Sequence, residues 1–259
     1  MFCSTKTSHR LFVILLGIFV CWAFAERGGS SAQAKSVWVV CIDPGHQLHG
    51  NSTPEPIGPG STTTKPCVSS GTAGALSGPE HGVNLNVGLK LRDILTSQGV
   101  QVVMTRTTAD VDLCNSARAA IANEAKADLF IRLHCNAGGA SARGAIMLYP
   151  ARITGWTDDI ATQSLAAAHV VQPIYEQVTG LPRSGTGYSE RSDLSGFNWS
   201  DVPSILPEML FQTNATDDAL AADDAFRQVM AQGLADGIMA YLRQYAPLDV
   251  PKNQGWVSH

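Results

Sequence analysis

The sequence is short of basic residues, of long apolar segments and of internal repeats. It has 18 Lys and Arg residues against 22 Asp and Glu residues, a formal net charge of −4. Such an acidic balance offers no broad basic face, which argues against nucleic acid as a partner. Only residues 11–24 form a long apolar run, so no other segment is expected to cross a membrane. Without a repeat, a chain of 259 residues suits one large domain.

The first 25 residues have the pattern of a secretory signal peptide. Lys6 and Arg10 precede the apolar run and give the segment a positively charged start. Residues 23–25 (Ala-Phe-Ala) form a small-x-small cleavage motif. The apolar run is shorter than the roughly 20 residues of a membrane span, so we expect cleavage after Ala25 rather than an uncleaved anchor. Cleavage leaves 234 residues with a net charge of −6, because two basic residues and no acidic one are removed. We therefore expect an exported protein.

Four cysteines remain after this cleavage. Cys67 and Cys114 both lie in loop-like sequence, whereas Cys41 and Cys135 end or follow apolar strand segments. An exported protein permits disulfides, and four cysteines allow three connectivities. We expect Cys67 and Cys114 to be joined, and the other two to be small buried apolar groups.

Short β-branched segments alternate with amphipathic segments along residues 37–245. This alternation predicts one α/β domain with a central, mostly parallel twisted sheet flanked by helices. Residues 26–36 read as a flexible linker and 246–259 as a tail. Residues 49–78 and 186–198 read as loops, and we expect the first to border the functional site. The predicted strands are 37–42, 100–105, 129–133, 144–149 and 202–206, and the predicted helices are 83–95, 116–125, 163–178 and 219–245.

Four polar residues lie at the ends of predicted strands or at the start of a predicted helix, where functional side chains are expected in an α/β fold. His46, His134 and Glu208 each follow a short apolar run, and Glu80 opens a helical segment. Ligands of open α/β sheets bind beyond the carboxyl ends of the strands, where these side chains can converge. Two histidines and one carboxylate form the ligand set of a catalytic zinc site, and a second carboxylate can move a proton.

Each of these residues also has an ordinary structural explanation. A single histidine at a strand end usually has a structural role. Glu80 could be a helix-start acid favoured by the helix dipole, and its neighbour His81 is a rival ligand. Glu208 is expected to be at least half buried, and buried carboxylates need a partner or a function. Its structural partner would be one of three arginines, Arg106, Arg118 or Arg132.

Together, the ordered motifs resemble a known family. They are Val39–His46, Glu80 with Asn84, Thr105-Arg106, Arg118 with Ala122-Asn123, Ala127–Asn136 and Pro203–Asn214. In this order they resemble the zinc-dependent N-acetylmuramoyl-L-alanine amidases, cell-wall hydrolases of the autolysin type. The pairable Cys67 and Cys114 and the segment Glu190–Leu194 look most like the compact single-domain mycobacterial-type amidases.

The resemblance implies a site and a reaction. Its metal ligands fall on His46, Glu80 and His134 around one Zn²⁺ per chain, and its catalytic glutamate falls on Glu208. The implied reaction is hydrolysis of the amide between N-acetylmuramic acid and L-alanine of the stem peptide in peptidoglycan. The implied location is secreted, periplasmic or in the cell wall. We expect a monomer without stable membrane insertion, and we expect Arg191 and Asp193 to contact the substrate, as loop residues near the site.

Three other functions stay open at this point. A zinc peptidase or carboxypeptidase could use the same site elsewhere on the stem peptide. A cysteine peptidase could use Cys135 or Cys41 with a histidine, and a non-catalytic peptidoglycan-binding regulator could share the fold. The chain departs from the family pattern at Arg132, where Ser is usual, at Cys135, where a small residue is usual, and after Glu208, where Glu-x-Gly-Phe is common.

Overall fold

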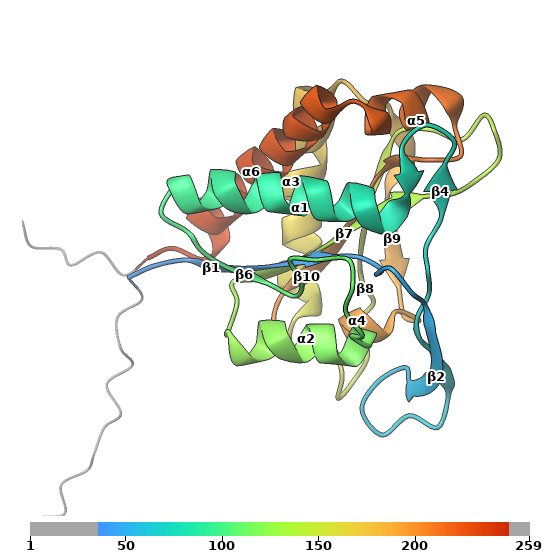
Figure 1. Cartoon of the computed structure of the whole chain (residues 1–259). Coiled ribbons are helices and arrows are strands. Elements are labelled where there is room, and N and C mark those ends of the chain that lie inside the picture. Colours follow the sequence, from blue (N-terminus) through green and yellow to red (C-terminus); the bar gives the residue numbers. More distant parts are fainter. Residues whose placement is uncertain (1–35, 249–259) are drawn as a thin grey trace, which may run out of the picture. The chain divides into compact units, whose positions relative to one another are not determined.

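Residues 36–248 are described by a computed structural model, in which a six-stranded sheet forms the centre (Figure 1). In spatial order its strands are β6 (Gln101–Met104), β1 (Val39–Pro44), β7 (Leu129–Asn136), β10 (Ser204–Phe211), β8 (Ala145–Pro150) and β9 (Arg183–Arg191). Strands β6, β1, β7 and β10 are mutually parallel, β8 runs antiparallel to β10, and β9 is parallel to β8. The mostly parallel α/β sheet is therefore confirmed. No helix within 36–248 is long and apolar enough to span a membrane.

Helices cover both faces of the sheet (Figure 1). One face carries α1 (Glu80–Ser97), α3 (Ala161–Thr179) and α6 (Asp224–Tyr245), which pack with the strands in the largest apolar cluster. The other face carries α2 (Asn115–Glu124), which packs over a smaller apolar cluster. The described residues also include two short helices, α4 (Ser195–Asn198) and α5 (Ala215–Ala222).

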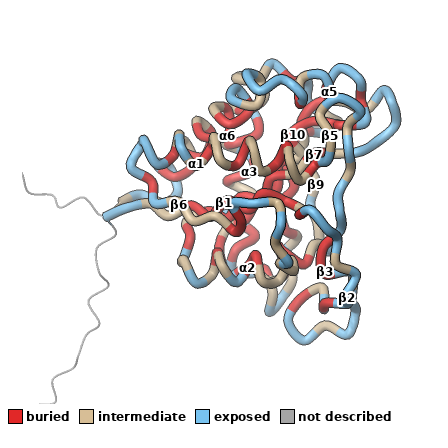
Figure 2. The backbone as a smooth tube through the Cα atoms, viewed as in Figure 1, coloured by how far each residue is buried: buried red, intermediate tan, exposed pale blue. Residues whose placement is uncertain are grey.

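Strand β7 shows why the strands are apolar on both faces. Ile131 packs on the α1 side and its neighbour Phe130 on the α2 side, because successive side chains of a strand point to opposite faces. A strand covered by helices on both faces therefore reads as a continuous apolar run. Figure 2 shows the central strands as buried over most of their length.

Two segments expected to be loops contain regular structure. Residues 49–78 form the antiparallel pair β2 (Asn51–Pro56) and β3 (Thr64–Val68), followed by the pair β4 (Ala73–Gly74) and β5 (Gly78–Pro79). Residues 186–198 contain the second half of β9 and all of α4. Their composition hid this structure, since Gly and Pro are depleted in strands except at edges and bends.

The hairpin of β2 and β3 is fastened to α2. Cys67 and Cys114 are joined in a disulfide, as expected, and the Asn115 side chain donates to the Cys67 carbonyl. The Glu55 carboxylate accepts from the backbone and side chain of Ser116 in the first turn of α2. Cys41 and Cys135 are free and buried, which is also the expected state.

A buried ion-pair cluster lies at the end of β1, directly before His46. Asp43 is fully buried and accepts from the guanidinium groups of Arg118 at 2.7 Å and Arg132 at 3.0 Å. Thr105 donates a third hydrogen bond to the same carboxylate. Burial by itself would raise the pKa of Asp43, but the two guanidinium groups outweigh it and hold that pKa well below its usual range. The cluster fixes the backbone that leads into the functional site.

Asp43→Asn is expected to destabilise the fold by about 3–5 kcal/mol at pH 7, because it leaves two buried guanidinium groups without their counter-charge. The folded pKa lies below the unfolded value of about 3.9, so the carboxylate stabilises the fold above that pH. The difference between variant and wild type should therefore narrow as the pH falls below about 4. Urea denaturation at several pH values measures it. Asp93→Asn, in an exposed pair with Arg92, serves as the control and should stay within about 0.5 kcal/mol of wild type.

Three expected segments fall wholly or largely outside 36–248. They are the signal peptide (1–25), the linker (26–36) and the tail (246–259). They stay predictions, as does the assignment of residues 37–245 as the catalytic domain.

Candidate metal and catalytic centre

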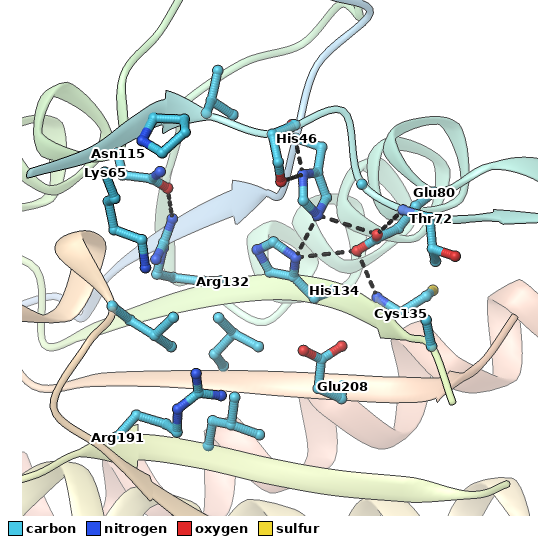
Figure 3. A pocket seen from close by; sticks show the side chains of 18 residues that line it. His46, Lys65, Thr72, Glu80, Asn115, Arg132, His134, Cys135, Arg191 and Glu208 are labelled. Atoms are coloured by element: carbon cyan, nitrogen blue, oxygen red, sulfur yellow. Dashed lines mark hydrogen bonds and ion pairs between the residues drawn. The ribbon is translucent and has the colours of Figure 1, made fainter. Parts of the chain in front are cut away.

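Three of the four residues singled out from the sequence meet at one point. His46 Nε2 lies 3.1 Å from Glu80 Oε2, and His134 Nδ1 lies 3.1 Å from Glu80 Oε1. The two imidazoles approach each other to the same distance, 3.1 Å between His134 Nδ1 and His46 Nε2. Figure 3 shows the three side chains pointing toward one another from different elements. Among the described residues they form the one cluster of His, Cys, Asp or Glu side chains with metal-binding geometry, and His81 is not part of it.

The three side chains reach this point from different kinds of local structure: a strand, the start of a helix and a turn. His134 is on β7, and Glu80 is the first residue of α1, preceded by the extended Pro79. His46 follows β1 with a φ of 59°, a left-handed conformation that is uncommon for a residue with a side chain. Gly45 is needed before it, because a Cβ there would lie 2.3 Å from His134 Nε2.

Two buried arginines hold this unusual turn in place. Arg106 donates to the carbonyls of Pro44 and Gly45, and Arg118 donates to the carbonyls of Pro44 and His46. Neither arginine pairs with Glu208, so the alternative expectation that Arg106 or Arg118 is the ion-pair partner of Glu208 is wrong. Their hydrogen bonds compensate for the backbone strain at His46, in the way that surrounding structure sustains strained residues at functional sites.

Backbone groups orient the imidazole of His46 and the carboxylate of Glu80. The Ser69 carbonyl lies 2.8 Å from His46 Nδ1, and a hydrogen bond there leaves Nε2 free to bind a cation. Glu80 accepts from the backbone N–H of Thr72 and of Cys135, and from the Asn84 side chain one helical turn further on. Ser69 and Thr72 belong to the segment between β3 and β4, which therefore borders the site as expected. Sequence reasoning missed these contacts, because backbone donors and acceptors leave no side-chain signal.

Charge and protonation at the cluster suit a divalent cation. Burial would raise the pKa of Glu80, but hydrogen bonds with His134 and His46 outweigh it and hold that pKa well below its usual range. Burial lowers the pKa of His134 to about 4, despite its hydrogen bond to Glu80. At neutral pH the cluster therefore presents a carboxylate and a neutral His134 imidazole, the forms that bind metals.

The geometry of the cluster fits a zinc ion. One ligand atom from each of the three residues lies within 4.8 Å of the other two, with the two imidazole nitrogens 3.1 Å apart, and tetrahedral zinc bonds of about 2.0–2.1 Å would place such atoms about 3.3 Å apart. Gly71, with a φ of +81°, borders the cluster, and a Cβ there would lie 2.7 Å from Glu80 Oε2. Three protein ligands of mixed His and carboxylate type match a catalytic site that keeps one position open.

Glu208 lies beside the cluster in a strand next to that of His134. It lies on β10 directly opposite His134 of β7. Its Oε2 is buried, and no hydrogen bond or ion pair to its side chain is found within residues 36–248. Burial, followed by repulsion from Glu80, raises the pKa of Glu208 to about 8. A carboxyl group that holds a proton near neutral pH is suited to general acid–base chemistry.

The positions of Glu208 and His134 within their strands differ from expectation. Both side chains project from inside a strand, in its C-terminal half, rather than from the residue after it. Only His46 follows the end of its strand. The expected convergence at the C-terminal side of the sheet is nevertheless what the structure shows.

A pocket of about 620 Å³ opens in front of the cluster. Arg191, expected from the sequence to contact the substrate, lines this pocket, whereas Asp193 does not and instead pairs with Arg191 through both carboxylate oxygens. Lys65 and Arg132 also line it. Sequence reasoning missed Lys65 because its segment read as a loop. It considered Arg132 as a partner for Glu208 and as a departure from the family pattern, but not as a residue of the pocket. Arg132 pairs with Asp43 instead.

Neither free cysteine has the properties of a nucleophile. Burial raises the pKa of Cys41 and of Cys135 far above the usual range for a thiol. Cys135 borders the pocket, but a thiol that stays protonated at neutral pH is inert. The structure thus speaks against a cysteine peptidase.

Comparison with known proteins assigns the chain to a family. Residues 40–240 match the family model described as N-acetylmuramoyl-L-alanine amidase. The chain belongs to the N-acetylmuramoyl-L-alanine amidase family. Among curated relatives, it is similar to N-acetylmuramoyl-L-alanine amidase Rv3717 of Mycobacterium tuberculosis, with 31% identity over 237 residues that cover 88% of this chain and 97% of the relative.

Solved structures of the same family share the fold. The amidase Ami1 of Mycobacterium smegmatis superposes with a TM-score of 0.73 at 29% identity, covering 82% of this chain and 99% of Ami1. Ami1 of Mycobacterium abscessus gives the same TM-score at 32% identity, covering 79% of this chain and 98% of that protein. The likeness to compact mycobacterial amidases that the sequence indicated is therefore confirmed.

Proposed function

We propose that this chain is a zinc-dependent peptidoglycan amidase that cleaves the bond between N-acetylmuramic acid and the L-alanine of the stem peptide. Family membership supports the reaction, and the convergence of His46, Glu80 and His134 beside the unpaired Glu208 carries the mechanism. In this proposal the two histidines and Glu80 hold one Zn²⁺. When bound, zinc supplies a Lewis acid that polarises the amide carbonyl and makes water more acidic.

Glu208 is the proton carrier in this mechanism. It accepts a proton from the attacking water and returns that proton to the leaving nitrogen of L-alanine, as one residue acting first as base and then as acid. Its raised pKa allows it to hold the proton between these two events. A cation bound next to it would favour the carboxylate form, which it needs for the first event.

The remaining residues of the centre keep these groups in place. The Ser69 carbonyl orients the His46 ring, and the N–H groups of Thr72 and Cys135 fix Glu80. Outer contacts of this kind hold ligand rings and carboxylates in their binding orientation. Export, a location in the periplasm or cell wall, and a monomeric state stay predictions.

The proposal is tested by mass analysis of the products of a purified muropeptide, with and without a chelator. We expect the zinc-loaded protein to release an intact stem peptide with a free L-alanine amine, and a chelator to stop the reaction until zinc is restored. A shortened peptide would instead indicate a peptidase acting elsewhere on the stem. Activity that survives complete removal of the metal would contradict the zinc mechanism.

A further inference from the structure

The pocket in front of the candidate metal centre has charges of opposite sign at its two ends. Of its lining residues in the described part of the chain, the carboxylates are Glu80 and Glu208, at the metal-binding end. The cationic residues Lys65, Arg132 and Arg191 line the rest. Figure 3 shows Lys65 and Arg132 on one side of the pocket and Glu80 on the other, with His134 and Glu208 between them.

Arg132 is the fixed element of the cationic end. Its side chain is only 4% exposed, its Nε donates to Asp43 and its Nη2 donates to Asn115 Oδ1 at 2.6 Å. Within residues 36–248 no acceptor is found for Nη1, and Gly196 packs against the guanidinium, because a Cβ there would lie 2.1 Å from Nη1 and 2.2 Å from Cζ. Arg132 therefore keeps donor capacity in a rigid guanidinium that borders the pocket.

Within residues 36–248 the one ion-pair partner of Arg132 is Asp43. Asp43 is shared between Arg132 and Arg118, so one carboxylate faces two guanidinium groups. Buried charges without a counter-charge are costly, and they are retained where a function uses them. An anion in the pocket would supply the missing charge.

Lys65 and Arg191 also bring positive charge to the pocket, but they differ in how far they are already paired with Asp193. Arg191 is already paired with both oxygens of Asp193. Lys65 Nζ donates to the Asp193 carbonyl at 2.7 Å and lies 4.0 Å from its carboxylate, which leaves two ammonium hydrogens available. We therefore regard Arg132 and Lys65 as the principal donors.

The spacing of these groups relates them to the scissile bond. Arg132 and His134 are two residues apart on β7 and point to the same face, which separates them by about 6.6 Å along the strand. An extended peptide advances about 3.3–3.6 Å per residue. A substrate whose amide lies at His134 and Glu208 thus brings a group one or two residues further on to Arg132.

We propose that Arg132 and Lys65 form a subsite for a carboxylate that the peptide carries within two residues of the scissile amide. This proposal rests on the proposed amidase function and names the form of substrate that the same pocket prefers.

The test compares two substrates that differ in one group. N-acetylmuramoyl-L-alanyl-D-glutamine has a free α-carboxylate on its second residue, and N-acetylmuramoyl-L-alanyl-D-glutaminamide has an uncharged amide there. The γ-carboxyl group is an amide in both, so neither substrate carries another carboxylate on its peptide. We expect the wild-type enzyme to favour the substrate with the α-carboxylate by about 10-fold or more in kcat/KM, the size expected for a hydrogen bond to a charged group. Lys65→Met and Arg132→Gln should each reduce this preference, measured as the ratio of the two kcat/KM values within each variant.

Controls separate this subsite from other effects. Arg183→Gln removes an exposed arginine on the same strand as Arg191 that does not line the pocket, and it should preserve the preference. Lys65→Met keeps the test valid if loss of the Asp43 contact prevents Arg132→Gln from folding. Equal kcat/KM for both substrates in wild type, or a preference unchanged in Lys65→Met and in folded Arg132→Gln, would overturn the proposal.

A binding measurement distinguishes this proposal from the proposed function. Calorimetry with L-alanyl-D-glutamine, which has a free α-carboxylate, and L-alanyl-D-glutaminamide, which has none, needs no turnover. Tighter binding of the dipeptide with the α-carboxylate, lost in Lys65→Met, would support the subsite even if neither muropeptide were hydrolysed, and only the amidase proposal would then fail. Equal binding of the two dipeptides would count against the subsite alone.

Discussion

Glu208→Gln should lower kcat by about 10²- to 10⁴-fold while the protein stays folded and keeps its metal. A positioned general acid–base contributes a factor of this size, and the amide of Gln cannot carry the proton. The substitution keeps the shape of the side chain and removes a buried group whose pKa is raised by burial and by repulsion from Glu80. The fold should therefore lose no stability. Initial rates on a defined muropeptide, zinc content and thermal unfolding provide the three readouts.

Glu124→Gln is the matched control for this change. Glu124 is an exposed glutamate at the end of α2 and does not line the pocket, so the same loss of a carboxylate there should leave kcat unchanged. If Glu208→Gln hydrolysed muropeptide at the wild-type rate, Glu208 would have no place in the mechanism. Loss of zinc together with activity would instead identify it as a residue that supports metal binding.

His134→Ala and His46→Ala should each weaken zinc binding by more than about 100-fold. Loss of an outer contact to a metal ligand already costs about 10- to 100-fold in affinity, and these variants lose a ligand itself. Activity at limiting zinc should fall in parallel. Zinc should also raise the melting temperature of the wild type, because a ligand that binds only the folded state stabilises it, and this increase should shrink in both variants. Chelator competition gives the affinities.

His169→Ala is the control for these two variants. His169 is an exposed residue on α3 whose ring lies against Tyr188, remote from the three converging side chains. It should bind zinc with wild-type affinity. A full zinc load in both His46→Ala and His134→Ala, measured at limiting metal, would refute the ligand assignment.

Much of the fold could be predicted because its signals are local. Strand β7 begins with the apolar run Leu129-Phe130-Ile131 because it is covered on both faces, and Gly180, with a φ of 66°, ends α3 close to the predicted helix end at residue 178. The hairpins within 49–78 could not be predicted, because they depend on contacts from distant residues. The Trp156 and Trp199 side chains hold the β2–β3 hairpin by donating to the carbonyls of Pro59 and Pro56.

For the candidate site, too, some features could be predicted from the sequence and others could not. His46, Glu80, His134 and Glu208 could be selected from residue type and from their place next to strands or helices, and their order along the chain indicated the family. The partners of these residues could not be selected in this way. The carbonyl of Ser69 has no side-chain signature, and it reaches His46 only because two hairpins fold back across the end of β1.

The main helices and the strands β1, β6, β7, β8 and β10, the identity of the metal-competent residues and the family were thus determined by the sequence alone, because periodicity and motif order are properties of neighbouring residues. The tertiary structure decided that His46, Glu80 and His134 come within 3.1 Å of one another. It also decided that Glu208 stays unpaired beside them and that Arg132 pairs with Asp43 at the pocket edge. These relations depend on strand register and on loop docking, which bring together groups that are distant in the chain.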